Sequence, residues 1–413
     1  MTATIVIVFT VVYLGMILGG LPFLQLDRAG VALLGAIALV SFNALNLDEA
    51  AGAIHLPTLI LLFAFMVISA QMRLGGFYDW VTLRLAALPL KPAWLLGAVM
   101  FVIAGLSAVF SNDITCLAIS PVLIDACRKR QLDPVPFLLG LACSANIGSA
   151  ATLIGNPQNI LIGQTLGLSF AGYSAQAIPP VLLGLAVSWA FIAWQTHGRW
   201  VLSDRAVLAP VASEQRVEQV PLDRWQTTKG LFVAGALLIA FLFTPWPREH
   251  VALAGAGILL MSRKLHSRKM LGLVDWQLLI LFIGLFVVIH ALEQTRLLPS
   301  VIADLAASGV HLDQPGGLFA AAFVLSNVVS NVPAVMLLLP VAQHPDAGPL
   351  LALVSTLSGN LLVFGSIANI IVLDAAVRKD IHISWSRHAQ TGIPVTLATL
   401  VITGAFFWLL IDA

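Results

Sequence analysis

The amino-acid sequence predicts an all-α polytopic membrane protein built from two inverted repeats. The first observation is composition: of 413 residues, 59% are hydrophobic and 10% are charged, whereas soluble domains carry roughly 25% charged residues. The second is a series of apolar segments long enough to cross a hydrocarbon layer of about 30 Å as helices. The third is that sequence elements recur in the two halves of the chain. Helices are expected because lipid offers no partners to unpaired backbone groups, and the short alternating strands of a membrane barrel are not found.

The apolar segments form two groups, separated by one long polar stretch of mixed charge. They lie at about 2–20, 29–46, 57–72, 91–110, 114–127, 135–150, 158–168 and 177–197, and then at about 230–245, 249–262, 275–292, 316–329, 332–343, 349–362, 366–377 and 391–411. We therefore expect an N-terminal repeat at residues 1–197, a cytoplasmic linker at 198–229 and a C-terminal inverted repeat at 230–413. The first segment is not followed by a small-residue cleavage site, so we interpret it as a membrane helix and not as a signal peptide.

Four pairs of segments support the duplication, because they occur in the same order and at nearly constant offsets of 210 to 220 residues. The pairs are Val31–Leu39 with Val251–Leu259, Leu59–Leu61 with Leu279–Leu281, Ser111-Asn112 with Ser330-Asn331, and Gly155–Asn159 with Gly365–Asn369. Each repeat is expected to contain five transmembrane helices, one re-entrant hairpin and one broken helix.

The placement of lysine and arginine predicts the orientation of the chain. If the N-terminus is outside, 19 of the 21 basic residues lie on the cytoplasmic side, and only Arg248 and Arg296 lie outside. Five crossings per repeat is an odd number, so the second repeat is inverted and the C-terminus is also outside. The two hairpins then enter from opposite sides, and their tips can meet near the midplane, as in inverted-repeat transporters.

Each predicted hairpin has a small polar tip inside an apolar run. The first tip is Ser111-Asn112-Asp113, and the second is Ser330-Asn331-Val332-Pro333. Serine and asparagine carry donors and acceptors on short side chains and tolerate turns. A helix that begins at such a tip presents free N–H groups and a partial positive charge. We predict that Ser111, Asn112, Ser330 and Asn331 contact the substrate.

Each repeat also contains one helix that is interrupted by glycine, asparagine or proline. Unwound carbonyls at membrane depth are tolerated where they are buried or line a cavity, and there they can coordinate a cation. The predicted substrate-binding residues in these breaks are Asn146, Gly148, Ser149, Asn156 and Asn159 in the first repeat, and Gly365, Ser366 and Asn369 in the second. The alternative is that these small polar residues pack helices closely and form hydrogen bonds between them.

Asp113 is the polar residue that is not duplicated, since Val332 occupies the equivalent position. An acid in the membrane interior is costly and is typically functional. We predict that Asp113 carries the coupling proton, or binds a coupling cation. A role in capping the following helix is the alternative, and the two roles are compatible.

Several classes of function are not expected. Cys116, Cys127 and Cys143 lack metal-ligand spacing and are expected to fill core positions. No nucleophile with a neighbouring base and no H-E-x-x-H motif is found, so we expect neither an enzyme nor a metal site nor a bound cofactor. No basic tail indicates nucleic acid. The expected partners are the lipid bilayer and a small inorganic oxyacid or anion. A homodimer and a separate ATPase subunit stay open, because the sequence has no ATP-binding loop of its own.

Together these motifs resemble the ion transporter superfamily, which includes arsenite permeases, sodium/proton antiporters, citrate transporters and divalent anion/sodium symporters. The likeness rests on Ser111-Asn112-Asp113, Gly155–Asn159, Ser330-Asn331-Val332-Pro333 and Gly365–Asn369. It implies two inverted repeats of five helices with one re-entrant hairpin each. The Asn-Asp of the first tip and the Asn-x-Pro of the other tip are most similar to arsenite permeases. Divalent anion symporters typically show Ser-Asn-Thr at both tips, where this chain has Asp113 and Val332.

This resemblance implies proton-coupled efflux of arsenite or antimonite across a bacterial inner membrane by alternating access. Arsenious acid is neutral at physiological pH, so Asp113 would not repel it, whereas an ionised Asp113 would repel a dicarboxylate. A sodium- or proton-coupled transporter of anions or carboxylates is the alternative, and a sodium/proton antiporter is a further one. The expected coupling ion is the proton, with sodium as the alternative.

Overall fold

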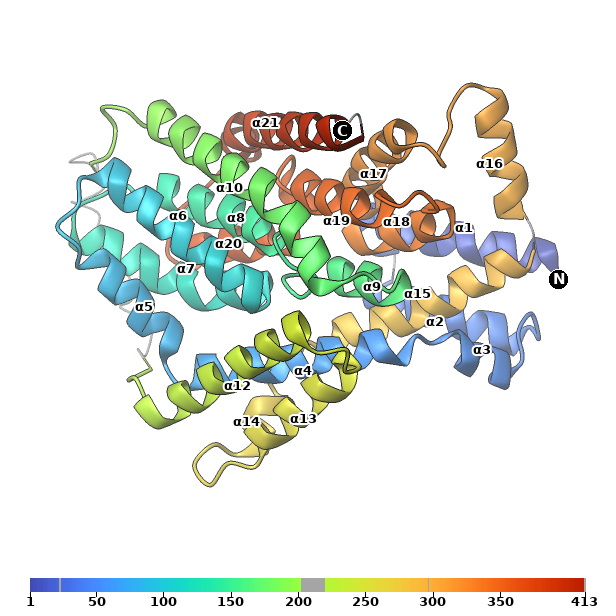
Figure 1. The fold of residues 1–413 in the computed structure, drawn as a ribbon, viewed down its shortest axis with the longest axis horizontal. Coiled ribbons are helices and arrows are strands. Elements are labelled where there is room, and N and C mark those ends of the chain that lie inside the picture. The colour runs from blue at the N-terminus through green and yellow to red at the C-terminus, as the bar shows by residue number, and fades with distance from the viewer. Residues whose placement is uncertain (22–23, 202–219, 296, 412–413) are drawn as a thin grey trace.

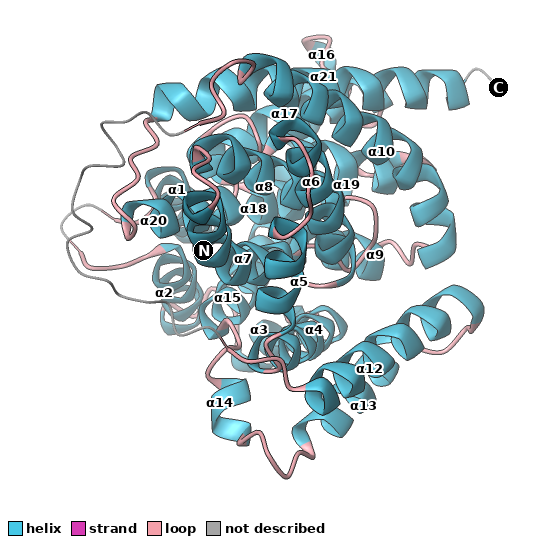
Figure 2. Cartoon of the chain, turned by 90° about the vertical axis from the view of Figure 1, so that its left-hand side faces the viewer, coloured by secondary structure: helices cyan, strands magenta, loops and turns pink. Residues whose placement is uncertain are grey.

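The computed structural model is helical throughout the residues it describes, which are 1–21, 24–201, 220–295 and 297–411. Figure 2 shows these helices surrounding one another, with no strand among the described residues apart from an isolated bridge between Leu132 and Val201. Six of the helices are long and apolar enough to cross a membrane: Leu56–Leu74, Pro92–Val109, Phe170–Gln195, Arg224–Phe243, Trp276–Gln294 and Trp385–Leu409. These findings confirm the predicted all-α polytopic membrane class.

The described residues of the first half form ten α-helices. They are α1 Thr2–Leu18, α2 Arg28–Ser41, α3 Leu47–Ala53, α4 Leu56–Leu74, α5 Phe77–Ala86, α6 Pro92–Val109, α7 Asn112–Lys129, α8 Pro134–Ser149, α9 Pro157–Thr165 and α10 Phe170–Gln195. Short polar signals set their starts. Asn46 forms a capping box with Glu49 before α3, and Asp133 accepts a hydrogen bond from the Val135 N–H before α8.

The second half presents the same order of elements. They are α12 Arg224–Phe243, α13 Arg248–Leu260, α14 Ser267–Leu271, α15 Trp276–Gln294, α16 Leu297–Ala307, α17 Pro315–Val329, α18 Asn331–Leu338 with the short η1 Leu339–Val341, α19 Ala347–Ser358, η2 Val363–Gly365, α20 Ile367–Val377 and α21 Trp385–Ile411. By order along the chain, α1 corresponds to α12, the α6–α7 pair to the α17–α18 pair, and α10 to α21.

Helices from the two halves pack together in matched pairs. The helix α2 packs against α15, and the corresponding α13 packs against α4 (Figure 1). The long helices α10 and α21 pack against each other. Such reciprocal contacts are what a two-fold relation between the halves produces. The corresponding helices α8 and α19 form the centre, because every residue of α19 is buried and only Val135 of α8 is not.

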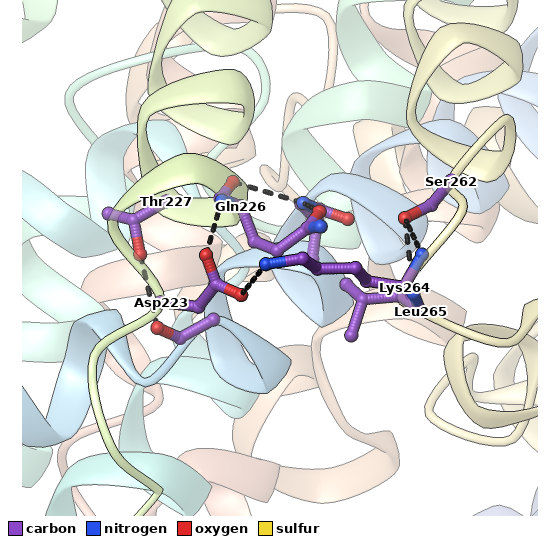
Figure 3. A network of polar contacts seen from close by, with 8 residues as sticks. Asp223, Gln226, Thr227, Ser262, Lys264 and Leu265 are labelled. Atoms are coloured by element: carbon purple, nitrogen blue, oxygen red, sulfur yellow. Dashed lines mark hydrogen bonds and ion pairs between the residues drawn. The ribbon is translucent and has the colours of Figure 1, made fainter.

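The junction between the halves is tied to the end of α4 by a polar cluster, shown in Figure 3. Asp223 accepts from the Gln226 N–H at 3.1 Å and lies 3.8 Å from Lys264 Nζ. Thr227 Oγ1 donates to the Gly75 carbonyl at 3.1 Å. The helix α12 begins at residue 224, inside the predicted linker at 198–229. Residues 202–219 of this linker lie outside the described residues.

Segments predicted on the same side of the membrane contact one another. On the predicted cytoplasmic side, Arg128 Nη2 donates to the Lys379 carbonyl at 2.6 Å. On the opposite side, the Arg248 guanidinium donates to the Leu168 carbonyl. Which side faces the cytoplasm stays a prediction.

Candidate substrate and coupling site

The first hairpin tip is docked onto the break between α8 and α9. Asn112, the first residue of α7, is 6% exposed. Its backbone N–H points to the Gly155 carbonyl at 3.4 Å, and its Nδ2 donates to Asn146 Oδ1 at 3.3 Å. Its Oδ1 accepts from the Asp113 N–H at 3.0 Å. The side chain of Asn112 therefore links the tip to the interior of the protein and also supports the first turn of α7.

The break in the first half is held open by asparagines. Asn156 caps α9 by accepting from the Asn159 N–H at 2.9 Å. Asn159 Nδ2 donates to the unwound Thr152 carbonyl at 3.0 Å. Gly155 is required for the fold of this segment, since an added Cβ would lie 2.2 Å from the Ser149 carbonyl oxygen. The amide of Asn159 thus satisfies a carbonyl that the broken helix leaves without its usual partner.

The break in the second half repeats this design 210 positions later. Ser366 caps α20, with its Oγ accepting from the Ala368 N–H at 3.2 Å. Asn369 Nδ2 donates to the Gly359 carbonyl at 2.8 Å and to the Leu362 carbonyl at 3.1 Å. Leu362 and Asn369 are the counterparts of Thr152 and Asn159, so both breaks use an asparagine amide in the same place.

The two breaks are also bonded to each other by reciprocal contacts. In one direction, Asn146 Nδ2 donates to Asn369 Oδ1 at 3.2 Å. In the other, Thr356 Oγ1 donates to Asn159 Oδ1, also at 3.2 Å. Thr356 is the counterpart of Asn146 at the offset of 210. Each half therefore positions an asparagine in the break of the opposite half.

Further hydrogen bonds also connect the two breaks. Ser366 Oγ donates to Asn146 Oδ1 at 2.9 Å, and Asn156 Nδ2 donates to Thr356 Oγ1 at 3.0 Å. Asn146 Nδ2 also donates to Asn360 Oδ1 at 2.8 Å. We call this set the buried amide network. Its members are Asn112, Asn146, Ser149, Asn156, Asn159, Thr356, Asn360, Ser366 and Asn369, and all of these residues are buried.

The structure thus brings together seven of the predicted site residues: Asn112, Asn146, Ser149, Asn156, Asn159, Ser366 and Asn369. The site prediction did not include Thr356 and Asn360. Thr356 could have been found, since it lies 210 residues after Asn146. Gly148 has a packing role, because an added Cβ would lie 2.3 Å from the Ala104 backbone. Gly365 likewise lies close to the Gly359 carbonyl, at 3.0 Å from an added Cβ.

The second hairpin tip is not bonded into this network. Ser330 has φ 76° and ψ 161°, a conformation that a residue with a side chain rarely adopts. Asn331 Oδ1 is buried and has no hydrogen-bond partner among the described residues. The same holds for Ser326 Oγ and Asn327 Oδ1, while Asn327 Nδ2 donates to the Phe323 carbonyl at 2.9 Å. The second tip, taken together with the last turn of α17 that leads into it, therefore carries three buried oxygen atoms that can accept hydrogen bonds and that the described protein leaves unpaired.

Asp113 lies at the edge of the network. Its backbone N–H is bonded to Asn112, but its carboxylate makes no hydrogen bond to any network side chain. Asp113 is half-buried, and Asp275 at the start of α15 lies within electrostatic reach of it. Ser111 is linked to another helix, because its N–H points to Ser69 Oγ on α4 at 3.4 Å.

Chemically, the network offers neutral amide and hydroxyl groups and the N-terminal ends of helices. None of its nine members carries a charge. Among the described residues, no group of three or more His, Cys, Asp or Glu side chains could hold a metal ion. Such a site can bind a small molecule with several hydroxyl groups, or an anion held by helix N-termini.

Comparison with known proteins shows what this chain is similar to. The sequence profile of a family described as "Citrate transporter" matches residues 5–357. A 46 kDa membrane protein of Mycobacterium leprae (strain TN) is 29% identical over 413 residues, covering 93% of this chain and 94% of the relative. The silicon efflux transporter LSI3 of Oryza sativa subsp. japonica is 28% identical over 470 residues, covering 96% and 95%. The inner membrane protein YbiR of Escherichia coli (strain K12) is 30% identical over 346 residues, covering 84% and 86%.

Proposed function

This chain belongs to the citrate transporter family of secondary transporters, and from that premise we propose that it exports a small neutral oxyacid, namely arsenite or antimonite in its protonated form, in exchange for protons. The observation that carries the proposal is the second hairpin tip. Its three buried atoms without partners, Ser326 Oγ, Asn327 Oδ1 and Asn331 Oδ1, can all accept hydrogen bonds. A trihydroxy acid carries O–H donors that match them, and pairing buried acceptors is worth about 1–3 kcal/mol each.

The charge of the site supports the same class of substrate. A neutral acid needs no basic partner, and the buried amide network contains none. The rice relative is by its name a silicon efflux transporter. Silicic acid, like arsenious acid, is a small hydroxylated molecule that is neutral at physiological pH. The relative's name therefore supports both the chemical class and the direction of transport proposed for this chain.

In the proposed cycle, Asp113 couples transport to protons. This acid is the second residue of α7, next to the docked tip, and binds a proton from the outer side. The protonated and ionised forms favour different positions of the first hairpin against the breaks, because only the ionised form is repelled by Asp275. The alternation of access that moves protons inward from the outer side moves the oxyacid outward. A bacterial inner membrane with the N-terminus outside is the proposed setting.

A second candidate is a sodium- or proton-coupled carboxylate transporter. The observation in its favour is the family profile, whose description names citrate. A carboxylate would be held by the helix N-termini at Asn112, Asn331 and the two breaks. The oxygens of a carboxylate only accept hydrogen bonds. Two of the three unpaired atoms at the second tip are amide oxygens, which also only accept, so they would find no donor on a carboxylate. We therefore rank this candidate second.

Flux assays in proteoliposomes test the proposal. Arsenite, antimonite, silicic acid, sulfate, succinate and citrate are compared under an imposed pH gradient and, separately, an imposed sodium gradient. We expect arsenite or antimonite flux that is saturable, is driven by the pH gradient and is unaffected by sodium. Citrate or succinate flux without arsenite flux would favour the second candidate. Arsenite flux that ignores the pH gradient would contradict the proton coupling.

A further inference from the structure

His388 is a buried histidine that no part of the proposed cycle uses. It lies in the first turn of α21 and is 1% exposed. Neither Nδ1 nor Nε2 has a hydrogen-bond partner among the described residues. A buried imidazole without partners is costly, and buried polar groups of this kind call for a physical explanation.

The symmetry of the fold explains where His388 points. It is the fourth residue of α21, as Tyr173 is the fourth residue of α10. Tyr173 Oη donates to the Ala150 carbonyl at 2.7 Å, at the first break. The counterpart of Ala150 at the offset of 210 is Asn360, and His388 Nε2 and the Asn360 carbonyl oxygen both lie within 3.1 Å of the position that a Cβ on Gly392 would occupy. Both helices therefore place a ring with a polar atom against a carbonyl of the break, but only α21 uses a residue that can gain a charge.

Gly392 allows this close approach. One turn after His388, an added Cβ would lie 2.3 Å from the Asn360 carbonyl oxygen and 3.1 Å from His388 Nε2. The His388 imidazole and the Asn360 carbonyl are thus both close to Gly392. Asn360 Nδ2 is also buried without a partner among the described residues. Two neighbouring residues therefore hold three of the unpaired polar atoms of the described interior.

Asn360 joins this contact to the first hairpin. Asn360 Oδ1 accepts from Asn146, Asn146 Oδ1 accepts from Asn112, and Asn112 accepts from the Asp113 N–H. A change at His388 can therefore reach the tip that carries Asp113 through a continuous series of hydrogen bonds across both halves.

We propose that His388 is a second proton-binding site. It gains a proton when α21 packs against the second break, and it loses this proton when α21 moves away from the break. This rests on the proposed proton-coupled function. The proton comes from the aqueous phase on one side, forms an N–H bond on the imidazole, and leaves to the other side with no further reactant. The imidazolium has two N–H donors where the neutral ring has one, so protonation secures a donor for the Asn360 carbonyl.

No group that titrates near neutral pH competes for this role in the immediate surroundings. The elements with the most extensive contacts to α21 are α8, α10, α19 and η2. Their described residues include no Asp, Glu, Lys, Arg or His, and their titratable groups are Cys143 on α8 and Tyr173 on α10. On α21 itself the neighbouring Arg387 stays protonated at physiological pH. Histidine is the side chain among these whose ordinary protonation range covers physiological pH.

Nuclear magnetic resonance of the full chain, labelled with ¹⁵N-histidine in lipid nanodiscs, tests proton binding without any substrate. The His388 signal is identified by its loss in His388→Gln, or in His388→Tyr if the first variant does not fold. We expect this signal to change from the neutral to the protonated form between about pH 8 and pH 5. A ring that stays neutral over this whole range overturns the proposal, whether or not transport has been detected.

Flux assays then test coupling. In His388→Gln and His388→Tyr we expect uptake driven by a pH gradient to fall to the level of protein-free liposomes, while counterflow exchange of arsenite at equal pH continues. The exposed His382, changed to Gln, is the matched control and should behave as wild type. Full gradient-driven uptake in both His388 variants, or equal loss of uptake and exchange in both, overturns the proposal. If wild-type protein moves none of the probe solutes, the proposed function fails, and the spectroscopic titration alone decides the role of His388.

Discussion

The two hairpin tips stand at matching places in the chain but are built differently. The first tip is docked: Asn112 is bonded to Asn146 and Gly155, and Ser111 to Ser69. The second tip carries a strained Ser330 and leaves Asn331 Oδ1 buried without a partner among the described residues. The first tip is thus held by side-chain and backbone hydrogen bonds of its own asparagine, whereas the second tip is contacted at Pro333, whose carbonyl accepts from Tyr13 Oη at 3.2 Å, and its asparagine oxygen stays unpaired among the described residues.

This difference separates two tasks. Asp113 belongs to the docked tip, where a change of charge acts on residues that are already bonded together. The unpaired acceptors belong to the other tip, where a bound solute can satisfy them. We infer that, of the two tips, the first serves coupling and the second serves substrate binding. The following predictions test that division, and they begin with the residue that links the first tip to the second half.

Asn146→Ala should have the largest effect. Asn146 bonds to Asn112 in the first tip and to Asn360, Ser366 and Asn369 in the second half. Its loss leaves several buried groups unpaired, so we expect destabilisation of roughly 3–5 kcal/mol and loss of transport. Thermal unfolding of the purified protein and proteoliposome flux measure the two effects. Gln343→Ala, at an exposed position, is the control and should change neither.

Asp113→Asn should remove coupling but keep the fold. The carboxylate makes no hydrogen bond to the network, so the thermal unfolding temperature should stay within a few degrees of wild type. Transport driven by a pH gradient should be lost, because asparagine cannot bind and release a proton, while exchange at equal pH should persist. Unchanged pH dependence of flux in this variant would remove Asp113 from the coupling mechanism.

Asn331→Ala and Asn112→Ala form a matched pair across the two tips. Asn331 Oδ1 has no partner among the described residues, so its removal should leave stability nearly unchanged but raise the half-saturating substrate concentration about five- to tenfold, the equivalent of one hydrogen bond of about 1 kcal/mol. Asn112→Ala should instead lower stability by about 1–3 kcal/mol, because it removes one partner of Asn146 and the bond to the first turn of α7. Equal stability losses in the two variants would contradict the division of tasks.

The pattern of residues was sufficient to predict the all-α class, the positions of the six long apolar helices and most of the polar residues that meet in the centre, but not the helices α3, α5, α14 and α16. Offsets of 210 to 220 residues pointed to both breaks because local signals, Asn-Pro and Gly-Ser, interrupt apolar runs there. The reciprocal bonds between Asn146 and Asn369, and between Thr356 and Asn159, could not be predicted, because contacts of about 200 residues' separation depend on how whole helices pack.

The backbone conformation of the second tip also could not be predicted from the sequence. Nothing in the residues of the second tip indicates that Ser330 adopts a positive φ, since serine is common in ordinary turns. The position of the Asp113 carboxylate outside the network likewise depends on the direction in which α7 leaves its tip. His388 gave no local signal, because a histidine near the start of a membrane segment is ordinarily an interfacial residue. Its significance follows only from its burial and from its correspondence to Tyr173.

Replacing each tip serine by glycine should give the smallest effects, with opposite signs. Glycine adopts the φ of 76° at Ser330 without strain, so Ser330→Gly should stabilise the protein by up to about 1 kcal/mol. Ser111 has φ −54° and ψ 129°, which suits any residue, so Ser111→Gly should destabilise by about 0.5–1 kcal/mol through the greater freedom of the unfolded chain. Differential thermal unfolding of the two variants measures this contrast. If Ser330→Gly also weakens transport while raising stability, the strain at the second tip serves to hold Asn331 in position for the substrate; if transport is unchanged, the strain has no part in binding.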